Sequence, residues 1–248
     1  MNWYIGCSGF HYKHWKDIFY PKGLAQRQWF SYYSQQFSTL ELNVTFYRFP
    51  QVPFLKNWYN VSPENFRFAV KAPRAITHYK QFHNCTAMLS DFYGTIAQGL
   101  EEKLGPVLFQ MSPRFTYTEE KLVRIINSMD PAFRNVLEFR HPSWWQQGIF
   151  ETLAKHHISF CGMSHPELPD SLIYTTGLLY YRFHGVPDLY RTLNSHAFLN
   201  DTVSTISQQP DLSEAWLYFN NDMEAHAPQN ALELLTLVNE MAPAKQEH

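Results

Sequence analysis

The stretch Val136-Leu137-Glu138-Phe139-Arg140-His141-Pro142 changes within a few residues from an apolar strand pattern into a run of ionisable groups. Side chains of a strand point alternately to opposite faces, so Glu138 and Arg140 share one face while Leu137 and Phe139 share the other. Pro142 cannot donate to a strand ladder and therefore ends the strand. The stretch predicts a strand that presents a carboxylate and a guanidinium side by side at its C-terminal end.

Units of a strand followed by a helix fill the rest of the chain. Besides the opening stretch, apolar or alternating runs predict strands at 3–7, 39–43, 66–71, 107–110, 158–161, 178–185 and 214–219. Helical patterns lie at 25–37, 52–61, 86–104, 118–129, 149–156, 196–208 and 227–241. About eight such units without a long linker predict one α/β domain over residues 1–248, a single (β/α)₈ TIM-like barrel. The alternative is an open doubly wound sheet.

Polar residues gather after the predicted strands rather than before them. They are Ser8, Asn43, Lys71, Gln110, Arg140, His184 and Asn220. In a barrel, the C-terminal ends of all strands meet at the catalytic face. An open sheet would gather such residues less completely, at its switch point. This distribution favours the barrel and predicts a site at its C-terminal face.

Charge and cysteine usage restrict the function class and the compartment. The 20 basic and 22 acidic residues give a formal net charge of -2, so no overall basic field favours nucleic acid, although a local basic patch stays open. Cys7, Cys85 and Cys161 are widely spaced and form no CxxC pair, which disfavours disulfides and structural zinc. No apolar run approaches the roughly 18 residues that span a bilayer, and no signal peptide follows Met1. We expect a cytoplasmic protein that does not bind membranes.

Glu41 and Glu138 are carboxylates placed within predicted strands, and they can face one another across the barrel. Such a pair suits general acid–base chemistry, because a shared low-dielectric site raises one pKa and leaves the other group ionised. The alternative is that each carboxylate only pairs with a buried cation, Glu138 with Arg140 and Glu41 with Lys71 or Arg182.

The cations at the strand ends have similar alternatives. Lys71 resembles the Schiff-base lysines of barrel enzymes, which are activated by desolvation or a nearby cation, but a structural ion pair is the simpler interpretation. Arg140 and Arg182 are suited to clamp a carboxylate or phosphate, or to neutralise the buried glutamates. No nucleotide-binding glycine motif or GxSxG motif is present.

Three histidines, His78, His141 and His184, follow predicted strands, and they predict an acid, a base or a hydrogen-bond donor. A divalent metal held by these histidines with Glu41, Glu138 or Asp222 is an alternative that no HxH or HExxH spacing supports, so we expect no metal and no cofactor. The predicted catalytic residues are Glu41, Lys71, Glu138 and His184. The predicted substrate contacts are Asn43, Tyr47, His78, Gln110, Arg140, His141, Trp144, Arg182, Asn220 and Asp222.

Several motifs spread over nearly the whole chain resemble those of the YecE-like proteins, known as domain of unknown function 72. They are Gly6-Cys7-Ser8-Gly9 with Trp15, Glu41 to Tyr47, Lys71 with Ile76-Thr77-His78, Gly105-Pro106 with Phe109-Gln110, Glu138 to His141 with Trp144, Tyr181 to Gly185, and Phe219 to Asp222. The resemblance implies a TIM-like barrel whose activity is unassigned. Cys7, Phe10 and Met111-Ser112-Pro113 depart from the pattern, which bears on specificity more than on the fold.

Together these features predict a cytoplasmic barrel enzyme, a hydrolase, lyase or isomerase. Its substrate is a small anionic or polyhydroxylated molecule, such as a phosphorylated sugar or a nucleotide-like compound, and its chemistry is general acid–base. The alternative is a binding module that captures a small ligand or a nucleic-acid end without turnover. No obligate protein partner is indicated.

Overall fold

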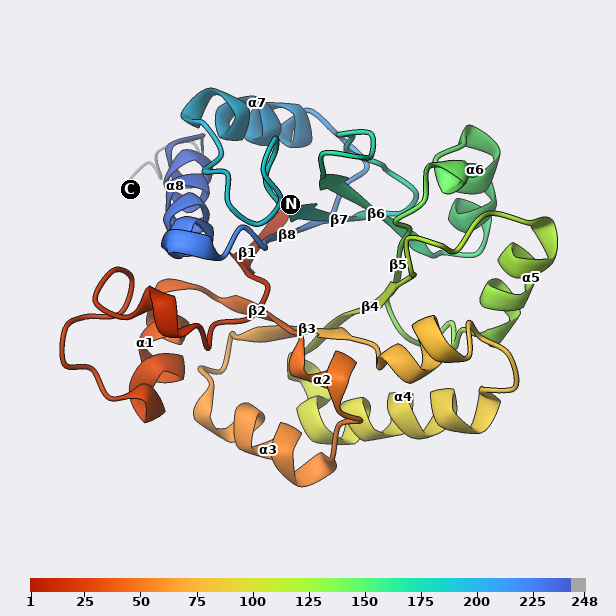
Figure 1. Ribbon diagram of the computed structural model, residues 1–248, viewed down its shortest axis with the longest axis horizontal. Coiled ribbons are helices and arrows are strands. Elements are labelled where there is room, and N and C mark those ends of the chain that lie inside the picture. Colours follow the sequence, from red (N-terminus) through yellow and green to blue (C-terminus); the bar gives the residue numbers. More distant parts are fainter. Residues whose placement is uncertain (242–248) are drawn as a thin grey trace, which may run out of the picture.

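Eight parallel strands surrounded by helices form the body of this protein in the computed structural model, which describes residues 1–241 (Figure 1). The strands are β1 (Asn2–Cys7), β2 (Thr39–Leu42), β3 (Arg67–Lys71), β4 (Leu104–Gln110), β5 (Asn135–Glu138), β6 (Ser159–Ser164), β7 (Leu178–Phe183) and β8 (Glu214–Phe219). The helices are α1 (Trp29–Gln36), α2 (Val44–Tyr47), α3 (Val52–Val61), α4 (Thr86–Leu100), α5 (Glu119–Ser128), α6 (Gln147–Lys155), α7 (His196–Ser207) and α8 (His226–Met241). Residues 242–248 of the predicted domain lie outside the described residues.

The sheet closes almost completely into a barrel. Its order is β1-β8-β7-β6-β5-β4-β3-β2, with every neighbouring pair parallel. The remaining seam between β1 and β2 is bridged where Ser8 pairs with Glu41 and the amide of Gly9 donates to the carbonyl of Glu41 at 3.0 Å. The predicted TIM-like barrel is confirmed, and the open doubly wound sheet is wrong. No helix within residues 1–241 combines the length and apolar character needed to cross a bilayer.

Aromatic side chains fill the barrel interior below the polar C-terminal ends of the strands, toward their N-terminal ends. Tyr4 and Trp216 stack with ring centroids 3.8 Å apart, and Tyr180 and Tyr218 pack above them with their centroids 5.3 Å apart. Ala69, Leu108, Val136 and Cys161 complete this inner cluster, which is separate from the larger core between strands and helices. The barrel is therefore a packed core, and the buried charged side chains of its interior, Glu41, Glu138 and Arg182, lie toward the C-terminal ends of its strands.

The fourth helix and strand differ from their predicted bounds. The helix expected over 86–104 ends at Leu100, and β4 begins at Leu104, so that it contains Gly105 and Pro106. Proline has no N–H for a ladder, but Pro106 lies where the pairing of β4 with β3 shifts its register. The irregular pairing explains why this proline does not end the strand.

Other boundaries moved by a few residues. β5 ends at Glu138, so Arg140 follows the strand instead of belonging to it, and β6 continues to Ser164 rather than ending at Cys161. The segments predicted as loops after β2 and β3 contain the short helix α2 and a π-helix at Ala75–Tyr79.

Candidate active site at the barrel mouth

Arg182 of β7 lies at the centre of a polar ring at the C-terminal ends of the strands. Only 1% of its side chain is exposed. Nη1 donates to Oε2 of Glu138 at 2.7 Å, and Nη2 donates to Oε1 of Glu41 at 2.7 Å and to Oγ of Ser8 at 2.8 Å. This guanidinium therefore joins side chains that come from opposite parts of the barrel wall, and the inward position expected for Glu138 and Arg182 is observed.

Glu41 is fully buried, and both of its oxygens have donors. Besides Arg182, the hydroxyl of Ser8 donates to Oε1, and the phenol of Tyr180 donates to Oε2 at 2.6 Å. The amide of Asn43 in turn donates to Oγ of Ser8 at 2.6 Å. With its acceptor sites occupied from several directions, Glu41 holds the ring together as a counter-charge to Arg182.

Glu138 is fully buried between two arginines. Nε of Arg140 donates to Oε1, while Arg182 binds Oε2. Burial by itself would raise the pKa of Glu138, but the charges of Arg140 and Arg182 outweigh it and hold this pKa at about 2. Glu138 is therefore an ionised carboxylate at neutral pH. The structure places a guanidinium between Glu41 and Glu138, which do not share a proton.

His184 is held in one tautomer by its neighbours. Arg140 Nη2 lies 2.9 Å from Nε2, and the amide of Asn220 lies 2.9 Å from Nδ1. Since a guanidinium can only donate, Nε2 must accept, and the ring proton then sits on Nδ1. The Asn220 atom 2.9 Å from Nδ1 is Nδ2, so this amide is assigned turned over, with its oxygen accepting from Nδ1. Burial, followed by the charges of Arg140 and Arg182, lowers the pKa of His184 well below its ordinary value. The imidazole is neutral and orients Arg140.

Lys71, at the end of β3, is a buried cation without a counter-ion. Its side chain is 8% exposed, and within residues 1–241 no hydrogen bond or ion pair reaches Nζ, which lies 4.3 Å from the centre of the Phe46 ring. Burial, followed by the charge of Arg182, lowers the pKa of Lys71 to about 7, although Glu138 and Glu41 act in the opposite direction. A large share of this amine is uncharged at neutral pH.

The Phe46 ring separates Lys71 from His78. The Phe46 and His78 rings meet edge to face, with centroids 5.1 Å apart, and the Thr77 hydroxyl lies 2.9 Å from Nδ1 of His78. Burial, followed by the charges of Lys71 and Arg74, lowers the pKa of His78. His78 is therefore a half-buried, neutral group on the same side of the mouth as Lys71.

A polar cavity of about 560 Å³ opens from the mouth beside Arg140. It lies between the ends of β4 and β5 and the loops that follow β6 and β7. Its charged and polar lining consists of Gln110, Arg140, His165, Glu167, Asp188, Tyr190 and Arg191. Arg140 donates through Nε to Glu138 and through Nη2 to His184, and no acceptor within residues 1–241 binds its Nη1.

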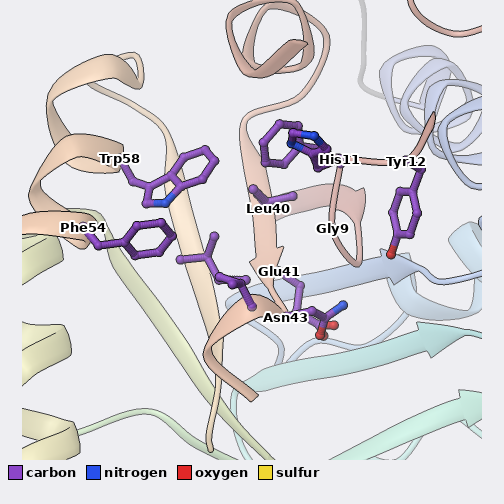
Figure 2. A pocket seen from close by; sticks show the side chains of 11 residues that line it. Gly9, His11, Tyr12, Leu40, Glu41, Asn43, Phe54 and Trp58 are labelled. Atoms are coloured by element: carbon purple, nitrogen blue, oxygen red, sulfur yellow. The ribbon is translucent and has the colours of Figure 1, made fainter. Parts of the chain in front are cut away.

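A second pocket, mostly apolar and about 410 Å³ in volume, lies on the other side of the mouth (Figure 2). Phe54 and Trp58 of α3 form one side, the loop of Gly9 to Tyr12 forms the other, and Glu41 and Asn43 lie between them. Gly9 has a φ of +89°, and a Cβ there would lie 2.9 Å from the Tyr12 hydroxyl, so the loop requires glycine. This aromatic pocket and the polar cavity flank the ring centred on Arg182.

Four of the predicted contact residues lie apart from the ring. Trp144 is fully buried and stacks on Phe139, with centroids 3.9 Å apart, so the structure places it in the core behind the strands. His141 accepts from the amide of Ser143 and caps a short helix. Tyr47, on α2, is 69% exposed. The backbone carbonyl of Asp222 accepts a hydrogen bond at 2.8 Å from the indole N–H of Trp15, which lies in the loop after β1.

Other ring residues were not predicted as site residues. Tyr180 lies two positions before Arg182 on β7, so strand alternation would have placed it on the inner face. His165 was missed because the predicted sixth strand stopped too early. Nothing in the sequence marks Phe46 as a site residue except its place within the motif Glu41 to Tyr47.

In the described part of the chain, no three side chains of His, Cys, Asp or Glu are grouped to hold a metal ion. The space between Glu41 and Glu138 is filled by the Arg182 guanidinium. The three cysteines are free and buried, in agreement with the expected absence of disulfides.

The fold and the site define a TIM-like barrel protein with an arginine-centred polar ring at its mouth. The family model described as "Protein of unknown function DUF72" matches residues 4–248. The chain belongs to this DUF72 family, which confirms the resemblance to the YecE-like proteins.

Relatives and solved structures agree with this assignment. The chain is 30% identical over 157 residues to the UPF0759 protein YunF of Bacillus subtilis (60% of this chain, 54% of YunF) and 26% identical over 117 residues to the UPF0759 protein YecE of Escherichia coli K12 (47% and 43%). It thus spans about half the length of these curated relatives. A DUF72 family protein of Thermotoga maritima has a TM-score of 0.87 at 26% identity (96% of this chain, 100% of that one). One from Enterococcus faecalis has a TM-score of 0.81 at 21% identity (96% and 95%) and shows the fold alone.

Proposed function

We propose that this protein is an enzyme that acts on a small anionic or polyhydroxylated molecule, such as a phosphorylated sugar or a nucleotide-like compound, by acid–base chemistry at the barrel mouth. The observation that carries the proposal is Lys71, a buried amine without a counter-ion whose pKa is about 7. A proton-transfer group is most effective when its pKa lies near the working pH. Lys71 is therefore the group that exchanges the proton.

The other predicted catalytic residues have supporting roles in this proposal. Glu138, with a pKa of about 2, is too weak a base, and Glu41 is enclosed by its donors. His184 accepts a hydrogen bond from Arg140 and directs the guanidinium toward the polar cavity. His184 is thus a positioning residue.

Substrate binding is assigned to the polar cavity. Nη1 of Arg140 binds a carboxylate or phosphate, and Gln110, at the end of β4, binds a hydroxyl or carbonyl group. A base beside a bound anion suits removal of a proton next to a carbonyl group, as in isomerases and lyases, more directly than hydrolysis. We place this enzyme in the cytoplasm, and its free, buried thiols support a reducing compartment.

A second candidate is a binding module without turnover. Its support is the full pairing of Glu41 and Glu138 beside an aromatic pocket, because paired charges below aromatic walls suit capture of a ligand. The net charge of -2 gives no support to a nucleic-acid ligand.

A thermal-shift screen with a panel of small phosphates, carboxylates and divalent ions tests the proposal. Ligands that bind the native state raise its unfolding temperature. We expect anions to stabilise the wild type and Lys71→Met, and to lose their effect in Arg140→Gln, with Lys22→Met as a matched control at an exposed lysine. Turnover of a stabilising anion by the wild type but not by Lys71→Met supports the enzyme. Equal turnover by both proteins would contradict it, and stabilisation without any turnover would favour the binding module.

A further inference from the structure

Within residues 1–241, two lysines have buried side chains, and their surroundings differ. Lys103 is 5% exposed, and its ammonium donates to the carbonyls of Tyr59 at 2.7 Å and Ser62 at 2.9 Å, and to the Ser62 hydroxyl at 2.9 Å. Lys71 is 8% exposed, and its amine has no such acceptor within residues 1–241. Because a buried ammonium needs acceptors, the surroundings of Lys71 are suited to an uncharged amine.

The backbone of Lys71 is bound to the first turn of α2. The Thr45 hydroxyl lies 2.6 Å from the Lys71 carbonyl and 2.9 Å from the Leu42 carbonyl, which ties α2 to the ends of β2 and β3. This contact sets the adjacent Phe46 ring against Nζ. The ring face lies at cation–π distance from Nζ, a weak attraction that replaces neither a lone-pair acceptor nor a counter-ion.

Neighbouring cations lower the pKa of Lys71, as burial does. Arg182 and Arg140 both disfavour the charged form of Lys71. The glutamates that oppose them are already bound by the same two arginines. Desolvation together with adjacent cations is the arrangement that makes a lysine nucleophilic, because only the unprotonated amine carries a free electron pair.

Resting on the substrate class and the Arg140 anion site of the proposed function, we propose that Lys71 acts as a nucleophile instead of a base and forms a Schiff base with the carbonyl carbon of a small anionic aldehyde or ketone, whose negative group is bound by Arg140. The substrate class follows from the two groups together. A nucleophilic amine selects a carbonyl, while the guanidinium beside the polar cavity selects a carboxylate or phosphate. A neutral carbonyl compound would lose the second interaction.

The covalent step balances without an oxidant or a reductant. The electron pair of Nζ attacks the carbonyl carbon, and the carbonyl oxygen takes up a proton to give a carbinolamine. Nζ loses one proton after the attack, and the hydroxyl takes up a proton from solvent and leaves as water while the nitrogen electron pair forms the C=N bond. One C=O bond is thereby replaced by the C=N bond of an imine that keeps one N–H. The protonated imine next withdraws electrons from the neighbouring carbon, which eases removal of a proton there or cleavage of a bond to it.

Borohydride trapping tests this proposal on the full chain. The protein is incubated with pyruvate or dihydroxyacetone phosphate as anionic probes, or with acetone or dihydroxyacetone as neutral probes, and the imine is reduced with sodium borohydride. Reduction adds a hydride to carbon and a proton to nitrogen, so the expected mass gain is that of the probe, less water, plus two hydrogens. We expect peptide mapping to place the label on Lys71, with the anionic probes at least about tenfold ahead of the neutral ones, a preference worth about 1.4 kcal/mol.

Variants separate the covalent step from binding. Lys71→Arg keeps a cation but cannot form an imine, so we expect no label, whereas Lys22→Arg at an exposed lysine should be labelled as the wild type is. Mapping of the wild type identifies the labelled lysine even if a variant fails to fold. Label distributed over surface lysines and unchanged in Lys71→Arg would overturn the proposal.

The remaining outcomes distinguish this inference from the proposed function. Absence of label from every probe, together with Arg140-dependent stabilisation by anions and Lys71-dependent turnover, overturns the Schiff base and leaves acid–base catalysis standing. Absence of label, of stabilisation and of turnover overturns both. Label on Lys71 without preference for anionic probes overturns the assignment of Arg140.

Discussion

Arg140 donates a hydrogen bond through Nη2 to Nε2 of His184 at 2.9 Å, and this contact fixes the proton of the imidazole on Nδ1. Burial, followed by the charges of Arg140 and Arg182, lowers the pKa of His184. We therefore expect His184 to stay neutral from pH 8 to pH 5 and to be protonated at Nδ1 throughout. Nitrogen-15 spectra of the histidine side chains measure both properties, and the signal missing from His184→Gln identifies the residue. Titration of that signal near pH 6.5 would contradict the lowered pKa, and a proton on Nε2 of the neutral ring would contradict the assigned tautomer.

The pairing of Glu138 with two arginines predicts a large cost for a small substitution. Glu138→Gln keeps the size of the side chain but leaves Arg140 and Arg182 buried with a neutral acceptor, so we expect the free energy of unfolding to fall by about 3–5 kcal/mol. Glu120→Gln is the matched control, because Glu120 is 84% exposed and pairs with Arg124 on the surface of α5. There we expect a change below about 0.5 kcal/mol. Urea unfolding at pH 7 measures both, and similar losses in the two variants would refute a structural role for Glu138.

The depressed pKa of Glu138 predicts how stability depends on acid. The folded pKa is about 2, and an unfolded glutamate has a pKa near 4.3. Because the folded value is the lower one, the stabilisation is present above the unfolded value and is lost as pH falls from about 4.5 toward 2. The gap in unfolding free energy between wild type and Glu138→Gln should therefore narrow in acid, by about 3 kcal/mol in all. A gap that stays constant between pH 7 and pH 3 would show that the carboxylate gains no proton on unfolding.

Much of the barrel could be predicted because its periodicity is local. Strand alternation alone places Glu138 on the inner face and Phe139 on the outer face, and the structure agrees. Trp144 shows the limit of that reasoning. It follows a polar loop in the sequence, yet it stacks on the outward ring of Phe139, a contact that becomes visible only when the loop is folded back.

The partners within the ring could be predicted only in part, because they depend on how the closed barrel brings distant strands together. The sequence offers Arg140 as the partner of Glu138 and either Lys71 or Arg182 as the partner of Glu41, and the structure shows the pairs with Arg140 and Arg182. What the sequence does not show is that the Arg182 guanidinium donates to both glutamates at once. Its fork of donors matches carboxylates better than a single ammonium does, which leaves Lys71 without a counter-ion. This competition among three strands has no signal in any one of them.

The unpaired amine of Lys71 predicts a substitution that stabilises the protein. Its folded pKa is about 7, whereas an unfolded lysine has a pKa near 10.4, so between these values unfolding takes up a proton. Stability therefore rises with pH through this window, and the cost of burying Lys71 is fully present below pH 7. Lys71→Met removes this cost, which the pKa difference puts at roughly 3–5 kcal/mol as an upper bound, and the variant should be more stable than the wild type at pH 6. We expect the difference in unfolding free energy between Lys71→Met and the wild type to shrink as pH rises from 7 to 10.

Lys103→Met is the control for that measurement. It makes the same substitution at a buried lysine whose ammonium has three acceptors, and removing the donor leaves those oxygens unsatisfied. We expect a loss of about 1–3 kcal/mol at pH 6, opposite in sign to the effect of Lys71→Met. Urea unfolding of both variants across this pH range decides the matter. If Lys71→Met were destabilised as much as Lys103→Met at pH 6, Lys71 would have to be a paired, charged lysine in solution, and its role as a neutral amine would be wrong.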